Sequence, residues 1–287
     1  MTGAGQEFVT AALRVEQSGA VATIVIDNPR RRNALTQDMW QQFGPILDRL
    51  AADPGVKVVV VRGAGNNFSA GADISDLKAI LRDPDSGAHD GGHVTAGENA
   101  LASFPKPTIA AIEGYCMGGA WQIAGACDIR IAADSATFGI TPAKVGIVYP
   151  LSGIERLVRL AGPATAKYLL LTGDFITASE AHELGLLARV VPAHQFQDEI
   201  QELARRIVTR SQLSTQAMKQ IVDAIAAHDP AIPSISSYWQ DQMAASGEPE
   251  EGIEAFLNKR EPNFRWSGGS LPVDPHRNDS YEPVRGI

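Results

Sequence analysis

Apolar residues follow two periods along this chain, one typical of strands and the other of helices. Residues 20–27 (AVATIVID) alternate and are rich in β-branched side chains, which predicts a strand that ends at an Asn-Pro pair. Residues 56–62 (VKVVVVR) and 108–112 (TIAAI) are almost continuously apolar, and residues 129–132 predict a further short strand. Continuous apolar runs are typical of strands buried on both faces, so the sequence predicts a parallel or helix-covered sheet.

Other segments carry apolar residues at helical spacing. Residues 36–50 are predicted to form a helix that Thr36 caps, with a bend or an interruption at Gly44-Pro45. Further helices are predicted at 74–81, about 94–104, 120–126, 153–160, 163–171, 178–184, 195–209, 213–228, 235–245 and 250–260. Strands are therefore confined to the first part of the chain, and helices dominate the second.

This change of pattern predicts the domain organisation. A strand-rich core is expected over residues 1–194, followed by a C-terminal helical region over 195–264. Residues 265–287 are rich in Gly, Pro and charge, and we expect them to be disordered or to contact a neighbouring subunit. Residues 82–92 are polar and rich in Gly and Asp, which predicts a surface loop.

Two glycine turns stand out because each follows a buried strand and precedes a helix. One spans residues 63–73, and the other, which contains Gly118 and Gly119, spans 115–128. Glycine lets backbone N–H groups approach a ligand, and a helix that begins there adds unsatisfied donors and the positive end of its dipole. The natural ligand is an oxygen that carries or develops negative charge. One such turn alone more often reflects tight packing, but two side by side would direct two donors at one oxygen.

The overall composition excludes several classes of protein. A net charge of −8 and a pI near 5.3 provide no general attraction for nucleic acid or an anionic membrane, so an anionic ligand must be met locally. Cys116 and Cys127 lie in apolar surroundings, which predicts buried thiols in a reducing compartment. His89 and His93 have no partner ligands, so we expect no metal site. The chain carries no signal-peptide pattern and no apolar run long enough for a membrane span, and we expect a cytoplasmic protein.

Several motifs occur in a fixed order along the chain. They are Asn28-Pro-x-x-x-Asn33-Ala-Leu, Phe68-Ser-Ala-Gly-Ala-Asp73-Ile, Gly114 to Gly119 followed by Cys127-Asp128, Ala178-x-Glu-Ala-x-x-x-Gly185-Leu-x-x-x-Val190-Val, and Phe256-Leu-x-Lys-Arg-x-Pro262-x-Phe. Together they resemble the crotonase (enoyl-CoA hydratase/isomerase) superfamily over about residues 12–264. The resemblance implies an α/β (α+β) fold, a spiral of ββα units with a C-terminal helical region used in trimerisation. It also implies a homotrimer or a dimer of trimers and an acyl-CoA substrate, with no cofactor beyond the coenzyme A of that substrate.

The same resemblance assigns candidate site residues. It places the two donors of an oxyanion hole on the backbone N–H groups of Ala72 and Gly119, which agrees with the two glycine turns. The positions that it assigns to substrate and coenzyme A binding are Arg30, Arg32, Ala34, Ala70, Asp73, Ile74, Gly118, Pro142 and Lys259. For the arginines a solvated corner remains equally open, and for Asp73 we favour a cap on the helix expected to begin at Ile74.

The chemistry of such a hole is simple. When a proton or CO2 leaves the carbon next to a thioester carbonyl, negative charge moves onto the carbonyl oxygen. Two fixed N–H groups in a dry pocket stabilise the resulting enolate, each by about 3 kcal/mol of barrier. The reaction is therefore expected to be that of a lyase or an isomerase acting on an acyl-CoA thioester.

The sequence departs from the hydratase pattern at the two glutamates that hydratases of the superfamily use. Gln122 and Pro142 occupy those positions here, and neither is a general base. Each acid–base group contributes about 10²–10⁴-fold, so hydration should be severely reduced while enolate stabilisation is kept. Decarboxylation fits this pattern, because departing CO2 leaves its electron pair behind and needs no base.

Residues 141–153 and 251–264 look most like methylmalonyl-CoA decarboxylases. In that family the tyrosine that matches Tyr149 hydrogen-bonds or orients the substrate carboxylate, a role suited to a phenol. The alternative is a Tyr149 in the pocket wall with its hydroxyl bonded to backbone. Those decarboxylases carry glutamate at position 122 and histidine at position 72. Gln122 is expected to position a water or the thioester, or to be a core-facing amide, and Lys144 more often points to solvent than to a carboxylate.

Three hypotheses about function stay open. The leading one is an acyl-CoA enzyme that stabilises a thioester enolate, with decarboxylation ahead of hydration. The second is an enoyl-CoA hydratase or isomerase whose base is another carboxylate, such as Glu98 or Glu113. The third is a non-catalytic acyl-CoA-binding protein. A dinucleotide-binding protein is not favoured, because neither glycine turn spells G-x-G-x-x-G after a first strand.

Overall fold

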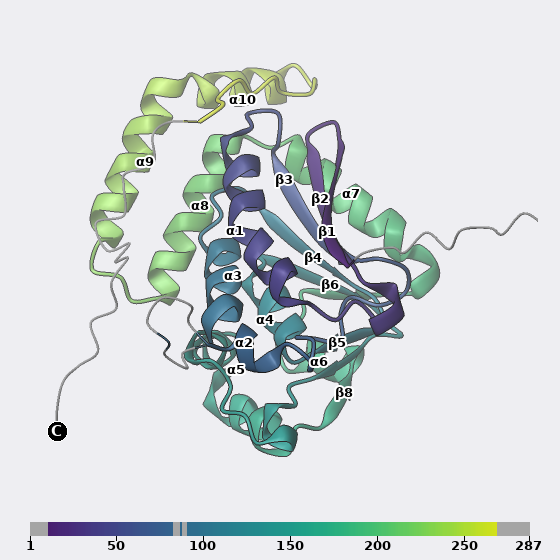
Figure 1. Ribbon diagram of the computed structural model, residues 1–287. Helices are drawn as coiled ribbons and strands as arrows, with labels where there is room; N and C mark the ends of the chain where they lie inside the picture. The colour runs from purple at the N-terminus through teal and green to yellow at the C-terminus, as the bar shows by residue number, and fades with distance from the viewer. Residues whose placement is uncertain (1–10, 83–86, 88–90, 269–287) are drawn as a thin grey trace, which may run out of the picture.

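A six-stranded sheet forms the centre of the molecule (Figure 1). The computed structural model describes residues 11–82, 87 and 91–268. β1 pairs antiparallel with β2, and every following neighbour in the sheet is parallel. In spatial order the strands are β1 (Ala12–Ser18), β2 (Val21–Asp27), β3 (Val58–Gly63), β4 (Thr108–Ile112), β6 (Ile129–Ala133) and β9 (Arg189–Val191).

A second, smaller sheet lies beyond the ends of β4 and β6. It consists of β5 (Tyr115–Met117), β7 (Thr137–Gly139) and β8 (Phe175–Thr177), in that order. The chain passes from β4 through a two-residue turn into β5 and then into a helix, and it repeats this path from β6 through β7. Single bridges join Ser69 to Cys116 and Leu35 to Ala72, so the segment after β3 follows the same route. The fold therefore repeats a unit of two strands and a helix, as the resemblance to the crotonase superfamily implied.

Helices cover both faces of the large sheet, because successive residues of its strands point to opposite sides. Val59 and Val61 of β3 face one apolar core, and Val58 and Val60 face another. The helices of the core are α1 (Gln37–Ala52), α2 (Leu77–Ile80), α3 (Gly92–Ala102), α4 (Gly119–Ala126), α5 (Leu151–Thr172), α6 (Ala178–Glu183) and α7 (Phe196–Val208), with the 3₁₀ turns η1 (Pro29–Arg31), η2 (Pro142–Val145) and η3 (Ala193–Gln195). Burial on both faces explains the continuous apolar runs that predicted these strands.

The two faces are covered by different parts of the chain. Side chains of α1, α3 and α4 fill the core on one face, and α7 packs on the other with Phe196, Ile200 and Ala204. Figure 1 shows α1 and α3 on one side of the strands and α7 on the other. α7 begins after residue 195, so part of the predicted C-terminal region packs directly on the sheet of the core.

The remaining helices form a C-terminal arm. α8 (Gln212–Ala226) leads to α9 (Ile232–Ser246) and α10 (Glu248–Leu257), which extend away from the core in Figure 1. Leu213, Ala217 and Trp239 form a small core of their own, to which Trp266 adds its ring. The backbone N–H groups of Arg265 and Trp266 donate to Glu248 Oε1, so this part of the tail folds back onto its own chain. The rest of the predicted tail, from residue 269, lies outside the described residues.

Three expectations about elements are wrong. α1 runs without interruption through Pro45. The carbonyl of Gln41, which loses its usual donor there, belongs to an exposed residue. The helix expected at 74–81 is reduced to α2, because Asp73 draws its neighbours into a turn. The strands β1, β5, β7, β8 and β9 were not predicted, and all except β1 are only three residues long.

The other long elements agree with the sequence to within a few residues, and the α/β class with its C-terminal helices is confirmed. The helices expected at 153–160 and 163–171 are joined in α5, with a non-helical Gly162 between them. Cys116 and Cys127 are buried as expected, and burial raises the pKa of the Cys127 thiol to about 12. Across the described ranges, no helix has both the length and the apolar character that a membrane span needs.

Candidate functional site

The structure brings the two glycine turns together. A Cβ built on Gly119 would lie 3.3 Å from the Ala72 backbone nitrogen, and one built on Gly71 would lie 3.3 Å from the Gly119 nitrogen. The bridge between Ser69 and Cys116 runs alongside this contact. The two amides that the sequence singled out are therefore close neighbours, although they are far apart in the chain.

The direction of the Ala72 N–H follows from the planar trans peptide, in which C=O and the next N–H point in opposite directions. The carbonyl oxygen of Gly71 accepts from the Leu35 N–H at 2.8 Å, so the Ala72 N–H points away from Leu35. Within the described part of the chain this N–H donates to no other backbone group. Ala72 is half-buried, so its donor is available at the edge of the core.

The Gly119 N–H has a defined direction for the same reason. It is the first residue of α4, and a helix leaves the N–H of its first residue without a partner inside the helix. The carbonyl oxygen of Gly118 accepts from the Tyr149 hydroxyl at 2.8 Å, and the Gly119 N–H points the opposite way. Gly118 has φ 51° and ψ −114°, a conformation that side-chain-bearing residues rarely adopt, which explains why glycine stands at this turn.

Asp73 anchors the first turn. Its carboxylate accepts from the Ser75 N–H at 3.0 Å, from the Ser75 hydroxyl at 2.7 Å and from Arg31 Nη1 at 2.5 Å. Burial tends to raise the pKa of Asp73, but the hydrogen bonds from Ser75 and the charge of Arg31 outweigh it and lower the pKa. No helix begins at Ile74, so the expected cap is wrong, and Asp73 instead holds the turn that carries Ala72.

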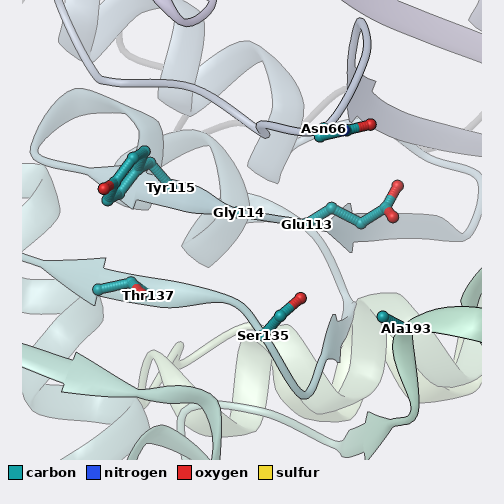
Figure 2. A pocket seen from close by; sticks show the side chains of 7 residues that line it. All are labelled: Asn66, Glu113, Gly114, Tyr115, Ser135, Thr137 and Ala193. Carbon is teal, nitrogen blue, oxygen red and sulfur yellow. The ribbon is translucent and has the colours of Figure 1, made fainter.

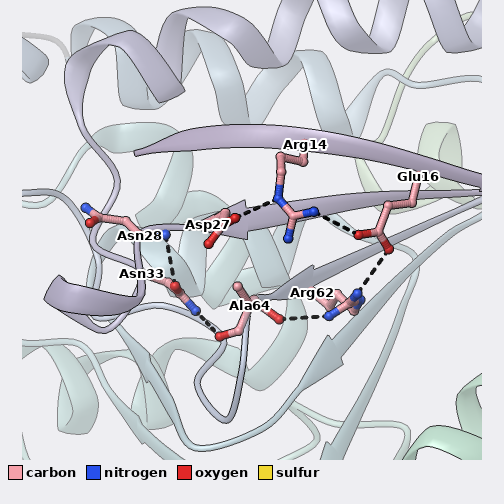
Figure 3. A network of polar contacts seen from close by, with 8 residues as sticks. Arg14, Glu16, Asp27, Asn28, Asn33, Arg62 and Ala64 are labelled. Carbon is pink, nitrogen blue, oxygen red and sulfur yellow. Dashed lines mark hydrogen bonds and ion pairs between the residues drawn. The ribbon is translucent and has the colours of Figure 1, made fainter. Parts of the chain in front are cut away.

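The arginine turn at residues 30–32 is fixed by two buried asparagines (Figure 3). Asn33 Oδ1 accepts from the Asn28 N–H at 3.1 Å, and its Nδ2 donates to the carbonyl oxygens of Ala64 and Asn67 at 2.8 and 2.7 Å. Asn33 has φ 60°, which asparagine tolerates better than most residues. Figure 3 also shows Arg14 between Asp27 and Glu16, beside this turn. The sequence motif Asn28 to Asn33 is therefore a brace between two loops.

The arginines themselves have different surroundings. Arg30 and Arg32 are exposed, and the Arg32 guanidinium lies 5.1 Å from the centre of the Tyr115 ring. Arg31, which the sequence analysis did not select, is the one paired with Asp73. Contact of Arg30 or Arg32 with coenzyme A stays a prediction.

The remaining predicted binding positions vary in exposure. Ala34 is 8% exposed, Ile74 is 80% exposed, and Ala70 donates its N–H to Arg32 O at 2.9 Å. Lys259 is exposed just after α10, an element that Figure 1 shows far from α2 and α4. The structure therefore does not bring Lys259 to the two glycine turns of its own chain.

Gln122 and Tyr149 lie together behind the second turn. A Cβ built on Gly153 would lie 2.7 Å from Tyr149 Cε1 and 3.0 Å from Gln122 Nε2. Tyr149 is 6% exposed, and burial together with the nearby Glu98 charge raises the pKa of its hydroxyl well above the ordinary value. The hydroxyl is protonated, and its proton is donated to Gly118 O. A role on a substrate carboxylate would need the hydroxyl to leave that acceptor, and the role stays a prediction.

Glu98 of α3 is a functional candidate that the sequence analysis mentioned only as an alternative. It is completely buried and accepts from Gln122 Nε2 at 2.8 Å, from Ser152 Oγ at 2.7 Å and from Arg156 Nε at 2.8 Å. The sequence contained one sign of this role, which is a charged residue in the middle of a predicted helix. Where such a residue is buried, it normally has a partner.

Pro142 and Lys144 stand in η2. Pro142 is the first residue of η2, and Lys144 Nζ lies 4.7 Å from the centre of the Phe175 ring. Lys144 therefore packs on β8. Proline provides no ionisable group at the position where hydratases of the superfamily carry their second glutamate.

Glu113, the other alternative base, lies elsewhere. It lines a cavity of about 520 Å³ together with Asn66, Gly114, Tyr115, Ser135, Thr137 and Ala193 (Figure 2). Its carboxylate accepts from Gln197 Nε2 at 2.8 Å, and burial raises its pKa. In Figure 2 its side chain extends away from Tyr115, the residue that leads toward the second glycine turn. Glu113 is therefore not brought beside Gln122.

The described residues contain no group of three or more His, Cys, Asp or Glu side chains that could hold a metal ion. His93 instead lies within hydrogen-bond distance of Gln37 and Gln41, and His89 lies outside the described residues.

The chain is similar to known proteins over most of its length. A family model described as enoyl-CoA hydratase/isomerase matches residues 16–267. The chain is 33% identical to a crotonyl-CoA hydratase of Syntrophomonas wolfei, over 87% of this chain and 96% of that protein. It is 31% identical to 2,3-dehydroadipyl-CoA hydratase of Escherichia coli, over 88% and 98%. A solved structure of an enoyl-CoA hydratase/isomerase family member has a TM-score of 0.86 at 44% identity, over 91% of this chain and 98% of the other.

The two curated relatives carry hydratase names, so the likeness to decarboxylases stays a prediction. The match over most of the chain, the repeated strand–strand–helix units and the paired amides all point to one assignment. This chain belongs to the enoyl-CoA hydratase/isomerase family of the crotonase superfamily.

Proposed function

We propose that this protein binds an acyl-CoA thioester and stabilises its enolate between the N–H groups of Ala72 and Gly119. The observation that carries this proposal is the close approach of two amides whose donors have no partner in the described structure. Fixed donors aimed at a developing oxyanion are typically worth about 3 kcal/mol each. No metal or separate cofactor is needed for this step, because the charge is met by backbone groups.

Decarboxylation of a 2-carboxyacyl thioester is the reaction that the surrounding residues support best. An enolate produced by loss of CO2 needs no general base. Gln122 and Pro142 are not bases, and both oxygens of Glu98 already accept hydrogen bonds, one of them from the guanidinium of Arg156. Glu98 is therefore engaged by protein donors at both carboxylate oxygens, which favours a reaction that needs no base from it.

Hydration or isomerisation is the second candidate, and one observation favours it. Glu98 is a carboxylate within 2.8 Å of Gln122, the position that resembles a catalytic glutamate of hydratases. The hydratase names of relatives point the same way. In this alternative Arg156 or Ser152 releases Glu98, which then acts as the base.

The test compares two substrates on the same protein. We expect CO2 release from methylmalonyl-CoA to be at least about 100-fold faster than hydration of crotonyl-CoA, because hydration lacks both acid–base groups. CO2 or bicarbonate release and loss of the enoyl absorbance measure the two reactions. Ordinary rates of crotonyl-CoA hydration would overturn this proposal in favour of the second candidate, and binding of both thioesters without turnover would indicate a non-catalytic acyl-CoA-binding protein.

Substitution Gly119→Ala tests the oxyanion hole itself. The added Cβ would lie 3.3 Å from the Ala72 nitrogen and 3.0 Å from Trp40 Cζ2, in the space between the two donors. We expect kcat/KM to fall about 10²–10³-fold, the usual effect of losing an oxyanion donor. Gly44→Ala is the matched control, because a Cβ there meets nothing within 4 Å. Equal activity of G119A and G44A would contradict the proposed hole.

We also propose that a second and a third copy of the chain complete the assembly as a homotrimer, or as a dimer of trimers. Exposed apolar side chains on α8 and α10 support this, because such side chains in register along a helix are typical of a buried interface. Lys259, at the end of the arm, would then reach the coenzyme A bound to a neighbouring copy.

A further inference from the structure

Glu98 stands out because it is a charged side chain with no exposed surface, close to the proposed reaction centre. Three donors from other helices converge on it: Gln122 of α4, and Ser152 and Arg156 of α5. Arg156 is 20% exposed and supplies the opposite charge at 2.8 Å. This buried carboxylate therefore has a hydrogen-bond donor at each of its two oxygens, and one of the donors is a guanidinium.

This arrangement fixes the orientation of the Gln122 amide. The atom of the Gln122 amide that lies 2.8 Å from Glu98 Oε2 is the NH2 nitrogen, which donates to the carboxylate oxygen. The amide oxygen of Gln122 then faces away from Glu98. No described residue donates a hydrogen bond to that oxygen. Gln122 lies in the first turn of α4, which begins at Gly119, so its side chain starts within one helical turn of the oxyanion donor.

We infer that Glu98, held by Arg156, is a positioning residue that presents the oxygen of Gln122, and not its nitrogen, to the reacting end of the thioester. An oxygen at this place accepts a hydrogen bond from a water molecule. It selects for a hydrogen-bond donor beside the α-carbon. This inference rests on the proposed function and assigns the step that follows loss of CO2.

In that step the bond between the α-carbon and the carboxylate has broken, and its electron pair resides in the enolate. The water held by Gln122 gives one proton to the α-carbon, and the enolate electrons form the new C–H bond. The hydroxide that remains combines with the departing CO2 to give bicarbonate. All atoms and charges balance with water as the only co-reactant.

The central variant is Glu98→Gln, which keeps the shape of the side chain and removes its charge. The new amide both donates and accepts, so the Gln122 amide loses its fixed orientation. Ser152→Ala is the matched control, because it removes one hydrogen bond to Glu98 Oε2 without removing the charge or the contact with Gln122. The double variant E98Q/Q122E exchanges the two side chains and keeps one amide and one carboxylate in contact.

We expect kcat for decarboxylation to fall roughly 10- to 100-fold in E98Q, because misplacement of the reacting water lowers a rate by about this factor. KM should stay within about twofold. S152A should lose less than about threefold. In D2O the wild type and S152A should place deuterium on one face of the α-carbon, and E98Q on both. Equal losses in E98Q and S152A, or one-sided deuteration by E98Q, would overturn the inference.

A binding measurement decides the matter even if the wild type does not decarboxylate. Titration calorimetry compares 3-hydroxybutyryl-CoA, whose hydroxyl donates, with 3-fluorobutyryl-CoA, which is similar in size and cannot donate. We expect the wild type and S152A to prefer the hydroxyl ligand by about tenfold, the effect of one good hydrogen bond. E98Q should prefer it by less than threefold, and E98Q/Q122E should regain the preference. A wild type without preference, or an E98Q variant that keeps it, would refute the positioning role whatever the reaction.

Discussion

At the level of single residues, the hydroxyl of Tyr149 determines how the Gly118–Gly119 peptide is held. It donates to Gly118 O at 2.8 Å, and Trp121 N donates to the same oxygen at 3.0 Å. Hydrogen bonds to a carbonyl polarise its peptide and strengthen the N–H on the other side. We expect Tyr149 to act on the proposed oxyanion donor through this peptide, whereas the likeness to decarboxylases implies a contact with the substrate carboxylate.

Tyr149→Phe separates these two roles. If the hydroxyl holds the peptide, kcat should fall about tenfold for every thioester that the protein turns over, with KM within about twofold, because the weakened donor acts on all enolates alike. Steady-state kinetics with a 2-carboxyacyl and an enoyl thioester measure this. Tyr115→Phe, whose half-exposed ring lies below Arg32, is the control. A loss confined to the 2-carboxyacyl substrate would show instead that Tyr149 contacts the carboxylate.

At the level of elements, η1 and the turn before α2 are joined by one ion pair. Arg31 Nη1 contacts Asp73 and Ser75 Oγ, and the Asp73 N–H donates to Leu35 O. The arginine turn therefore supports the loop that carries Ala72. Asp73 is 5% exposed, whereas the Arg31 side chain is 58% exposed, so water weakens their attraction.

The lowered pKa of Asp73 predicts a pH-dependent contribution to stability. A carboxyl whose pKa is lower in the folded state than its ordinary value of 3.8 stabilises the fold above that value, and the contribution is lost as the pH falls further. Asp73→Asn should therefore lower the free energy of unfolding by about 1 kcal/mol at pH 7, or the melting temperature by about 2 °C.

Thermal unfolding at equal protein concentration, from pH 7 down to pH 3, measures this effect. The difference between wild type and D73N should be constant above about pH 5 and shrink below about pH 4. Asp48→Asn, an exposed position on α1, provides the control. A difference that persists unchanged at pH 3 would show that Asp73 acts through shape and not through its charge.

At the level of the whole molecule, exposed apolar side chains collect on the C-terminal arm. Met218, Val222 and Ile225 are 58%, 61% and 54% exposed along α8. Ile253, Phe256 and Leu257 are 62%, 83% and 72% exposed along α10. Spacings of three and four residues place each set on one face of its helix, and such faces are costly to leave in water.

Val222→Glu places a charge in the centre of the α8 set. If this face is buried between copies, the charge cannot be hydrated there. The dissociation constant of the assembly should therefore rise about 100-fold or more. Sedimentation velocity should give a trimer or a hexamer for the wild type and a monomer for V222E. Gln201→Glu, on the exposed face of α7, should leave the assembly intact. A wild type that sediments as a monomer would refute the proposed assembly.

Much of the fold was predictable because strands and helices that are buried against a core have apolar residues at a regular local spacing. Residues 56–62 and 108–112 are almost continuously apolar, and they contain most of β3 and all of β4, each with helices on both faces. Shorter strands left no such pattern. β5, β7 and β8 have three residues each, and their pairing depends on partners distant in the chain.

The paired glycine turns were also recognisable from the sequence, since a residue without Cβ is required where φ is positive or where backbones approach closely. Gly71 and Gly118 both have positive φ, and Gly71 also lies close to the backbone of another segment. The direction of each N–H was not recognisable. It follows from hydrogen bonds that Leu35 and Tyr149 make to the preceding carbonyl oxygens, and those contacts form only after packing.

The sequence by itself determined the order of the buried strands β2, β3, β4 and β6 and of most of the helices, the two glycine turns, and the lack of a carboxylate at positions 122 and 142. Only the tertiary structure decided what surrounds the reaction centre. Gln122 meets Glu98 across 24 residues, Tyr149 meets Gly118 across 31, and Arg31 meets Asp73 across 42. Local periodicity records which face of an element is buried, but it does not record which element lies opposite. Polar contacts between elements therefore appear only when the elements pack.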